Sequence, residues 1–132
     1  MSTPRSILVL AIAALVLLLA ACGDDTTAPP PNSGIEGLVT IGPMCPVVQE
    51  NTPCPDEAYV ATIVIEDLDG DEVARTQSGE DGRYRVGVAP GTYWVLPQWP
   101  NEGAPPSAPE QQVEVRAGEY THADIQYDSG IR

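Results

Sequence analysis

The sequence contains no lysine and no phenylalanine, and it has a single histidine. All six basic residues are arginines, and 19 aspartates and glutamates outnumber them, which gives a formal net charge of −13. A surface of this sign repels nucleic-acid phosphates and anionic lipid headgroups. The composition therefore argues against a nucleic-acid-binding role and against a polybasic membrane patch.

Few residues are suited to catalysis. The only histidine, His122, falls on the outward face at the start of an expected strand, and the chain has neither a G-x-S-x-G nor an H-E-x-x-H motif. Neighbouring carboxylates such as Glu80 and Asp81 lie in an expected turn, where acidic residues are ordinary. We therefore expect neither an enzymatic activity nor a cofactor.

The only long apolar run lies at the front of the chain. Arg5 precedes an uninterrupted apolar stretch from Ile7 to Ala21. This stretch is shorter than the ~20 residues that a membrane-spanning helix needs, and it has the length of the hydrophobic part of a secretory signal peptide. The sequence thus predicts an export signal over residues 1–21.

The apolar run ends in Leu19-Ala20-Ala21-Cys22, which resembles the lipobox of bacterial lipoproteins. That resemblance implies cleavage between Ala21 and Cys22 and attachment of a diacylglycerol to the Cys22 thiol. The mature chain would then begin with a lipidated cysteine, anchored in the cell membrane or the outer membrane on the exported side. An ordinary secretory signal with an incidental cysteine is the alternative.

The next segment, residues 22–33, contains two aspartates, two threonines, three consecutive prolines and no large apolar side chain. Such a segment cannot bury a core. The prolines favour an extended polyproline II conformation with a rise of ~3 Å per residue. We expect a flexible tether that holds a folded domain, residues 34–132, away from the membrane.

From Gly34 onward the apolar residues recur with a period of two, which is typical of half-buried strands. Turn signals rich in glycine and aspartate, such as Asp67–Glu72 and Gly79–Gly82, separate the apolar runs. This pattern predicts an all-β fold, an antiparallel seven-stranded β-sandwich. The expected strands are 35–41, 60–67, 72–78, 83–88, 92–97, 111–116 and 121–127.

Three stretches within this pattern resemble the carboxypeptidase regulatory-like domain. They are GIEGLVTIGPMCPV at 34–47, the strand and turn that end at Gly70, and GEDGRYRVGVAPGTYWV at 79–95. The resemblance implies a transthyretin-like sandwich in which Tyr84 enters the core, and it brings no catalytic residue. Domains of that family accompany other modules as stability or binding elements.

The two remaining cysteines, Cys45 and Cys54, lie nine positions apart in a proline-rich segment. In an exported protein such a pair most simply forms a disulfide. Metal binding is the rival interpretation, but two thiols with no nearby histidine fall short of a four-ligand zinc site. We therefore predict a Cys45–Cys54 disulfide and no metal centre.

The turn Asp67–Glu72 places Asp67, Asp69 and Asp71 at positions 1, 3 and 5 of an EF-hand calcium loop. The match then fails, because Glu72 stands where glycine is needed and Ser78 stands where a bidentate glutamate is needed. We expect an acidic hairpin tip, with a weak calcium site as the alternative.

The segment Pro97–Glu110 is long for a connection in so small a sandwich, and Trp99 is its only large apolar residue. An exposed indole there could stack on a sugar ring or insert into a partner. The alternative is that it folds back over the sheet edge.

Taken together, the sequence predicts a non-enzymatic binding or structural module at the bacterial cell envelope. Its partner would be an unidentified envelope protein or glycan. A carbohydrate-binding module that uses Trp99 is the alternative function.

Overall fold

A computed structural model describes residues 32–47 and 50–132, which form nine strands and no helix. In this part of the chain nothing helical is long and apolar enough to cross a membrane. The expected signal peptide, Cys22 and nearly all of the expected tether lie outside the described residues. The strands are β1 (Gly34–Gly42), β2 (Glu57–Ala58), β3 (Thr62–Glu66), β4 (Glu72–Gln77), β5 (Arg83–Gly87), β6 (Gly91–Pro97), β7 (Gln111–Val115), β8 (Tyr120–His122) and β9 (Ile125–Asp128).

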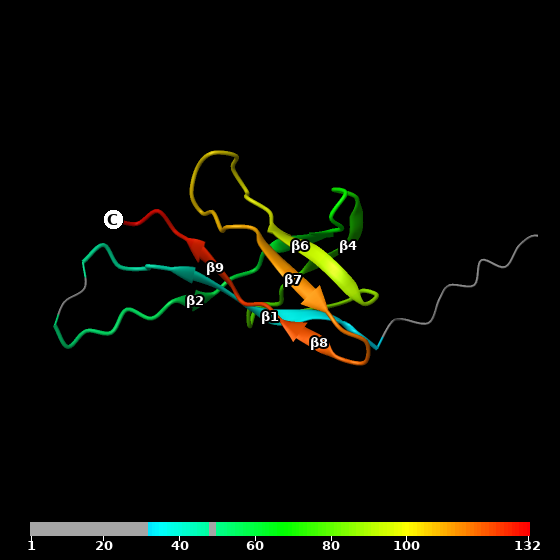
Figure 1. The fold of residues 1–132 in the computed structure, drawn as a ribbon. Coiled ribbons are helices and arrows are strands. Elements are labelled where there is room, and N and C mark those ends of the chain that lie inside the picture. The colour runs from blue at the N-terminus through cyan, green and yellow to red at the C-terminus, as the bar shows by residue number, and fades with distance from the viewer. Residues whose placement is uncertain (1–31, 48–49) are drawn as a thin grey trace, which may run out of the picture.

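The first sheet is organised around β1, which is long enough to pair with four other strands. It runs antiparallel to β5 along its first half and to β2 near its end. It runs parallel to β8 and β9, which follow one another along it (Figure 1). The second sheet has the order β4-β3-β6-β7 and is antiparallel throughout. The all-β sandwich that the sequence predicts is confirmed.

The last expected strand, residues 121–127, differs from the prediction in two ways. It divides into β8 and β9, and both run parallel to β1 in a sandwich that was expected to be antiparallel. The division falls at Ala123 and Asp124, where the Asp124 carboxylate accepts the Leu38 N–H at 2.8 Å in place of a backbone carbonyl. At the same point the Ala123 carbonyl lies so close to Gly37 that no Cβ fits there.

The segment before β3 was expected to start a strand at residue 60, but it passes from one sheet to the other. Buried Ser78 holds this crossing in place. Its hydroxyl donates to the Tyr59 carbonyl at 2.7 Å and accepts the Ala61 N–H at 2.8 Å. The short strand β2, which the sequence did not predict, pairs with the end of β1 just before the crossing.

The core between the sheets consists of isoleucines, valines, alanines and tyrosines. The alternating residues expected to face inward are buried, except Ile41 and Val86, which are partly buried against the core. Ser33, which falls in the expected tether, is also buried, and its hydroxyl donates to the Val88 carbonyl at 2.9 Å. The core cluster comprises Ile35, Val39, Ala61, Ile63, Ile65, Tyr84, Val88, Tyr93, Val95, Ala108, Val113, Val115, Ala123, Ile125 and Tyr127.

Candidate functional site

Two buried tyrosines are the most strongly perturbed titratable groups inside the described sandwich. The Tyr84 hydroxyl donates to the Ala123 carbonyl, and the Tyr127 hydroxyl donates to the Gln98 carbonyl at 2.7 Å. Burial raises the pKa of Tyr84, and burial together with neighbouring Tyr59 raises the pKa of Tyr127 to about 12. Both phenols therefore stay protonated at neutral pH and serve to hold the backbone.

His122 lies on the outward face of β8, as expected from the alternation. Its Nε2 atom is 2.9 Å from Asp124 Oδ1, the oxygen that also accepts the Leu38 N–H. A histidine and a carboxylate can orient one another for base catalysis, and in covalent catalysis such a pair activates a nearby hydroxyl or thiol. In the part of the chain that the structure describes, the surrounding pocket has no serine, threonine or cysteine in its lining.

This pocket is a shallow groove of about 510 Å³ across the outward face of β5, β1 and β8. We call it the β1 groove and define it by six side chains: Glu36, Leu38, Arg83, Arg85, His122 and Asp124. Their register places three strands side by side, with Glu36 between Arg85 and His122, and Leu38 opposite Arg83. The arrangement places one apolar side chain, Leu38, among cationic and anionic groups.

The two arginines of the β1 groove are held differently. Arg85 donates to the Glu36 carboxylate at 2.8 Å, and its guanidinium stacks over the Tyr120 ring at 3.5 Å from the centroid. The Arg83 guanidinium makes one long ion pair, 3.8 Å from the Asp81 carboxylate, and the Arg83 side chain is 81% exposed. The Arg85 guanidinium is therefore fixed in the face, whereas the Arg83 guanidinium is available to a ligand.

In the acidic hairpin tip, Asp67–Glu72, an aspartate carboxylate caps backbone N–H groups of the turn. Asp67 Oδ1 accepts the N–H groups of Asp69 and Asp71 at 2.9 and 3.0 Å, which closes the turn before β4. Gly70 supplies the positive φ of 87° that the turn requires. Among the described residues, no group of three potential ligands is arranged around a metal position.

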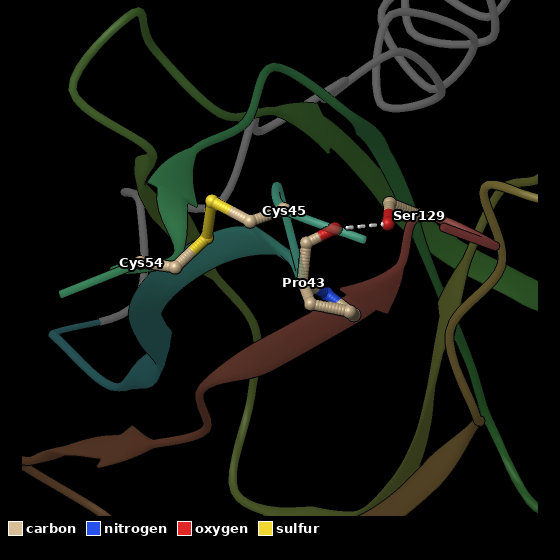
Figure 2. Close-up of a disulfide and its surroundings, with 4 residues drawn as sticks. All are labelled: Pro43, Cys45, Cys54 and Ser129. Atoms are coloured by element: carbon tan, nitrogen blue, oxygen red, sulfur yellow. Dashed lines mark hydrogen bonds between the residues drawn. A yellow bond between two sulfur atoms is a disulfide. The ribbon is translucent and has the colours of Figure 1, made fainter. Parts of the chain in front are cut away.

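The predicted disulfide is confirmed. Cys45 and Cys54 are joined with their Cα atoms 6.2 Å apart, and the bond closes the loop between β1 and β2 (Figure 2). The base of this loop is attached to the C-terminal segment, because Ser129 donates its hydroxyl to the Pro43 carbonyl and its N–H to the Gly42 carbonyl. The disulfide therefore stabilises a loop that extends beyond the sandwich (Figure 1).

Reduction of the Cys45–Cys54 bond should lower the free energy of unfolding by roughly 2–3 kcal/mol, because it releases the closed loop in the unfolded state. For ~100 residues this corresponds to a fall in Tm of about 10 °C or more. Thermal unfolding of residues 32–132 with and without a reductant measures it, and a Cys45→Ser/Cys54→Ser variant should not respond to the reductant. Two free thiols in the purified domain would refute the bond.

Trp99 combines features of both expected alternatives. Its side chain is about half exposed, at 45%, and it lines a depression together with Leu96, Ala108 and Pro109. Its Nε1 donates to the Ala108 carbonyl at 3.1 Å, which joins the two sides of the loop. The ring is thus accessible on one side while its only polar atom is already hydrogen-bonded.

The β1 groove was missed by sequence reasoning. The alternation of Arg83 and Arg85 with buried Tyr84 assigns the two arginines to the outward face of a strand. Their neighbours in the groove come from β1 and β8, which are far away in the sequence. The alternation along β1, with Glu36 and Leu38 outward, was the one available signal. Alternation assigns a face and says nothing of which strands lie beside it.

No family model matches the sequence, and no curated protein matches it. Solved structures of similar fold include two bacterial proteins. The minor pilin GBS52 of Streptococcus agalactiae aligns with a TM-score of 0.51 at 12% identity, over 74% of this chain and 44% of the pilin chain. The Bacillus anthracis TIE protein aligns with a TM-score of 0.51 at 18% identity, over 74% of this chain and 17% of the other.

At these identities the likeness concerns the fold alone, and this chain spans less than half the length of either protein. The names of both structures describe bacterial proteins, and neither name is that of an enzyme. The resemblance to the carboxypeptidase regulatory-like domain is not tested by these structures and stays a prediction.

Proposed function

We propose that this protein is a lipid-anchored, exported β-sandwich that serves as a non-enzymatic binding or structural module at the bacterial cell envelope. The pairing of the cysteines is the observation that carries the proposal. Two of the three cysteines in the chain form the Cys45–Cys54 disulfide, which suits an oxidising compartment outside the cytoplasm. The third, Cys22, directly follows the signal-like apolar run, where a lipoprotein would carry its acyl chains.

The hydrogen bonding of the polar groups in the sandwich supports a non-enzymatic role. Within residues 32–47 and 50–132, every buried polar side-chain atom has a hydrogen-bond partner. The perturbed tyrosines donate to backbone carbonyls, and the histidine–aspartate pair has no nucleophile in its groove. The likeness to a protein named as a minor pilin supports a structural role on the cell surface.

Labelling with a radioactive fatty acid tests the proposal, because the label must enter the full chain and must depend on Cys22.

A second candidate function rests on Trp99, whose half-exposed indole lies beside a depression, as a ring that stacks on a sugar would. We regard sugar binding as the alternative function, because the indole N–H donates to the Ala108 carbonyl and is not available to a sugar hydroxyl.

We expect no saturable binding of polysaccharides to the domain, and hence no difference between the wild-type protein and Trp99→Ala in a calorimetric titration. Indole fluorescence provides a second readout in a Trp94→Tyr background, where Trp99 is the only tryptophan. Stacking would instead contribute on the order of 1–3 kcal/mol to sugar binding. Saturable binding that is lost in Trp99→Ala with the fold intact would favour the carbohydrate function.

A further inference from the structure

The β1 groove is unusual in so acidic a molecule. The described residues include five arginines and one histidine, and three of these six line the groove. The ion pairs of the other arginines have N–O distances of 2.7–3.2 Å, and the pair of Arg83 with Asp81 is the longest at 3.8 Å. The groove also contains the carboxylates of Glu36 and Asp124, which pair with Arg85 and His122 at 2.8 and 2.9 Å, so Arg83 is its least compensated cation. Arg83 lies opposite Leu38, an apolar side chain that is 37% exposed.

An occupant that complements Arg83 and Leu38 carries a carboxylate beside an apolar side chain. The turn between β3 and β4 has this chemistry. Leu68 is 60% exposed at its tip, and Asp69 and Asp71 follow it without entering any ion pair of the described residues. The turn is also preorganised, because Asp67 holds it through two backbone hydrogen bonds, so little entropy is lost when it docks.

One copy cannot fill its own groove. The turn extends from the end of the β4-β3-β6-β7 sheet, whereas the groove lies on the face of the other sheet that points away from the core. Two copies can make the contact, with the turn of one molecule on the groove of the next. The surfaces are different, so the contact is heterologous and extends to a chain or a ring of copies.

We propose that this protein self-associates head to tail, with the β3–β4 turn of one copy docked in the β1 groove of another. Leu68 lies on Leu38, and the Asp69 carboxylate faces Arg83. The proposal deepens and rests on the structural role inferred above. It does not depend on the lipid, so the cross-linking below can fail while acylation of Cys22 succeeds, and the reverse.

Site-directed cross-linking of the full chain in cells tests the contact. Two differently tagged copies are co-expressed, one carrying Leu38→Cys and the other Leu68→Cys, and a short bismaleimide joins thiols that come close. We expect a mixed-tag dimer in higher yield than from the matched pair Leu38→Cys with Val73→Cys. Val73 is on the same hairpin and is 46% exposed, but it lies outside the turn. A yield equal to that of the control pair would overturn the proposal.

A charge swap tests the electrostatic part of the contact. Arg83→Glu in the Leu38→Cys copy should reduce the yield to the control level, and adding Asp69→Arg to the Leu68→Cys copy should restore it. Resistance of each variant to proteolysis verifies its fold. A cross-link that survives Arg83→Glu unchanged would mean that the groove is not the docking site.

Discussion

Replacing Tyr127 with alanine should lower the free energy of unfolding of residues 32–132 by about 3–5 kcal/mol, the cost of a large cavity in a core. Tyr127 has no exposed surface, and its ring lies 4.9 Å from that of Tyr59. It sits on β9, so the cavity would weaken the contact between β1 and the last strand. Chemical denaturation followed by circular dichroism measures the change. A loss below ~1 kcal/mol would mean that β9 is not part of the core.

Tyr127→Phe is the matched control, because it keeps the ring and removes only the hydroxyl. The lost hydrogen bond to the Gln98 carbonyl, 2.7 Å long, should cost about 0.5–1.5 kcal/mol. The two variants together separate the packing of the ring from the attachment of the loop that contains Trp99.

Comparison of Tyr127→Phe with the wild-type protein also tests how the free energy of unfolding depends on pH. Because burial raises the pKa of Tyr127 from 10.0 to about 12, the unfolded chain releases this proton at a lower pH than the folded domain does. The corresponding stability is fully present below pH 10 and is lost as the pH rises to about 12. Tyr127→Phe should therefore lose less stability than the wild-type protein over this range. Tyr84, whose pKa is also raised, accounts for part of the remaining slope.

The strands and the disulfide could be predicted from the sequence because their signals are local. Alternation such as Ile63 and Ile65 against Thr62 and Glu66 identifies a strand and its buried face without reference to any partner. The Cys45–Cys54 pair is likewise close in the sequence, so its geometry depends little on the rest of the fold.

The pairing of the strands could not be predicted, because it is decided by residues far apart in the chain. Nothing in the alternation of residues 121–127 indicates that they run parallel to β1. Their division depends on one hydrogen bond, from Leu38 to Asp124, that spans 86 positions. The β1 groove, which combines side chains from β1, β5 and β8 with Asp124, escaped prediction for the same reason.

The loop that contains Trp99 illustrates an intermediate case. Loops of this length are usually either functional or disordered, and this one is attached to the sandwich at several points. Ser107 pairs with Asp128 in an isolated bridge, Tyr127 donates to Gln98, and Trp99 donates to Ala108. The order of this loop could not be predicted from residues 97–110 alone, because two of the three attachments involve Tyr127 and Asp128 of β9.

Incorporation of a radioactive fatty acid into the full chain, compared with the Cys22→Ala variant, tests the lipid-anchored assignment most directly. Because the resemblance to a lipobox makes Cys22 the acylated residue and the first residue of the mature chain, we expect strong labelling of the wild-type protein. The Cys22→Ala protein should carry no label and should keep the size of the unprocessed chain. The Cys45→Ser/Cys54→Ser variant is the control for cysteine loss as such, and it should label like the wild type. Equal labelling of the Cys22→Ala and wild-type proteins, or no labelling of either, would contradict the assignment.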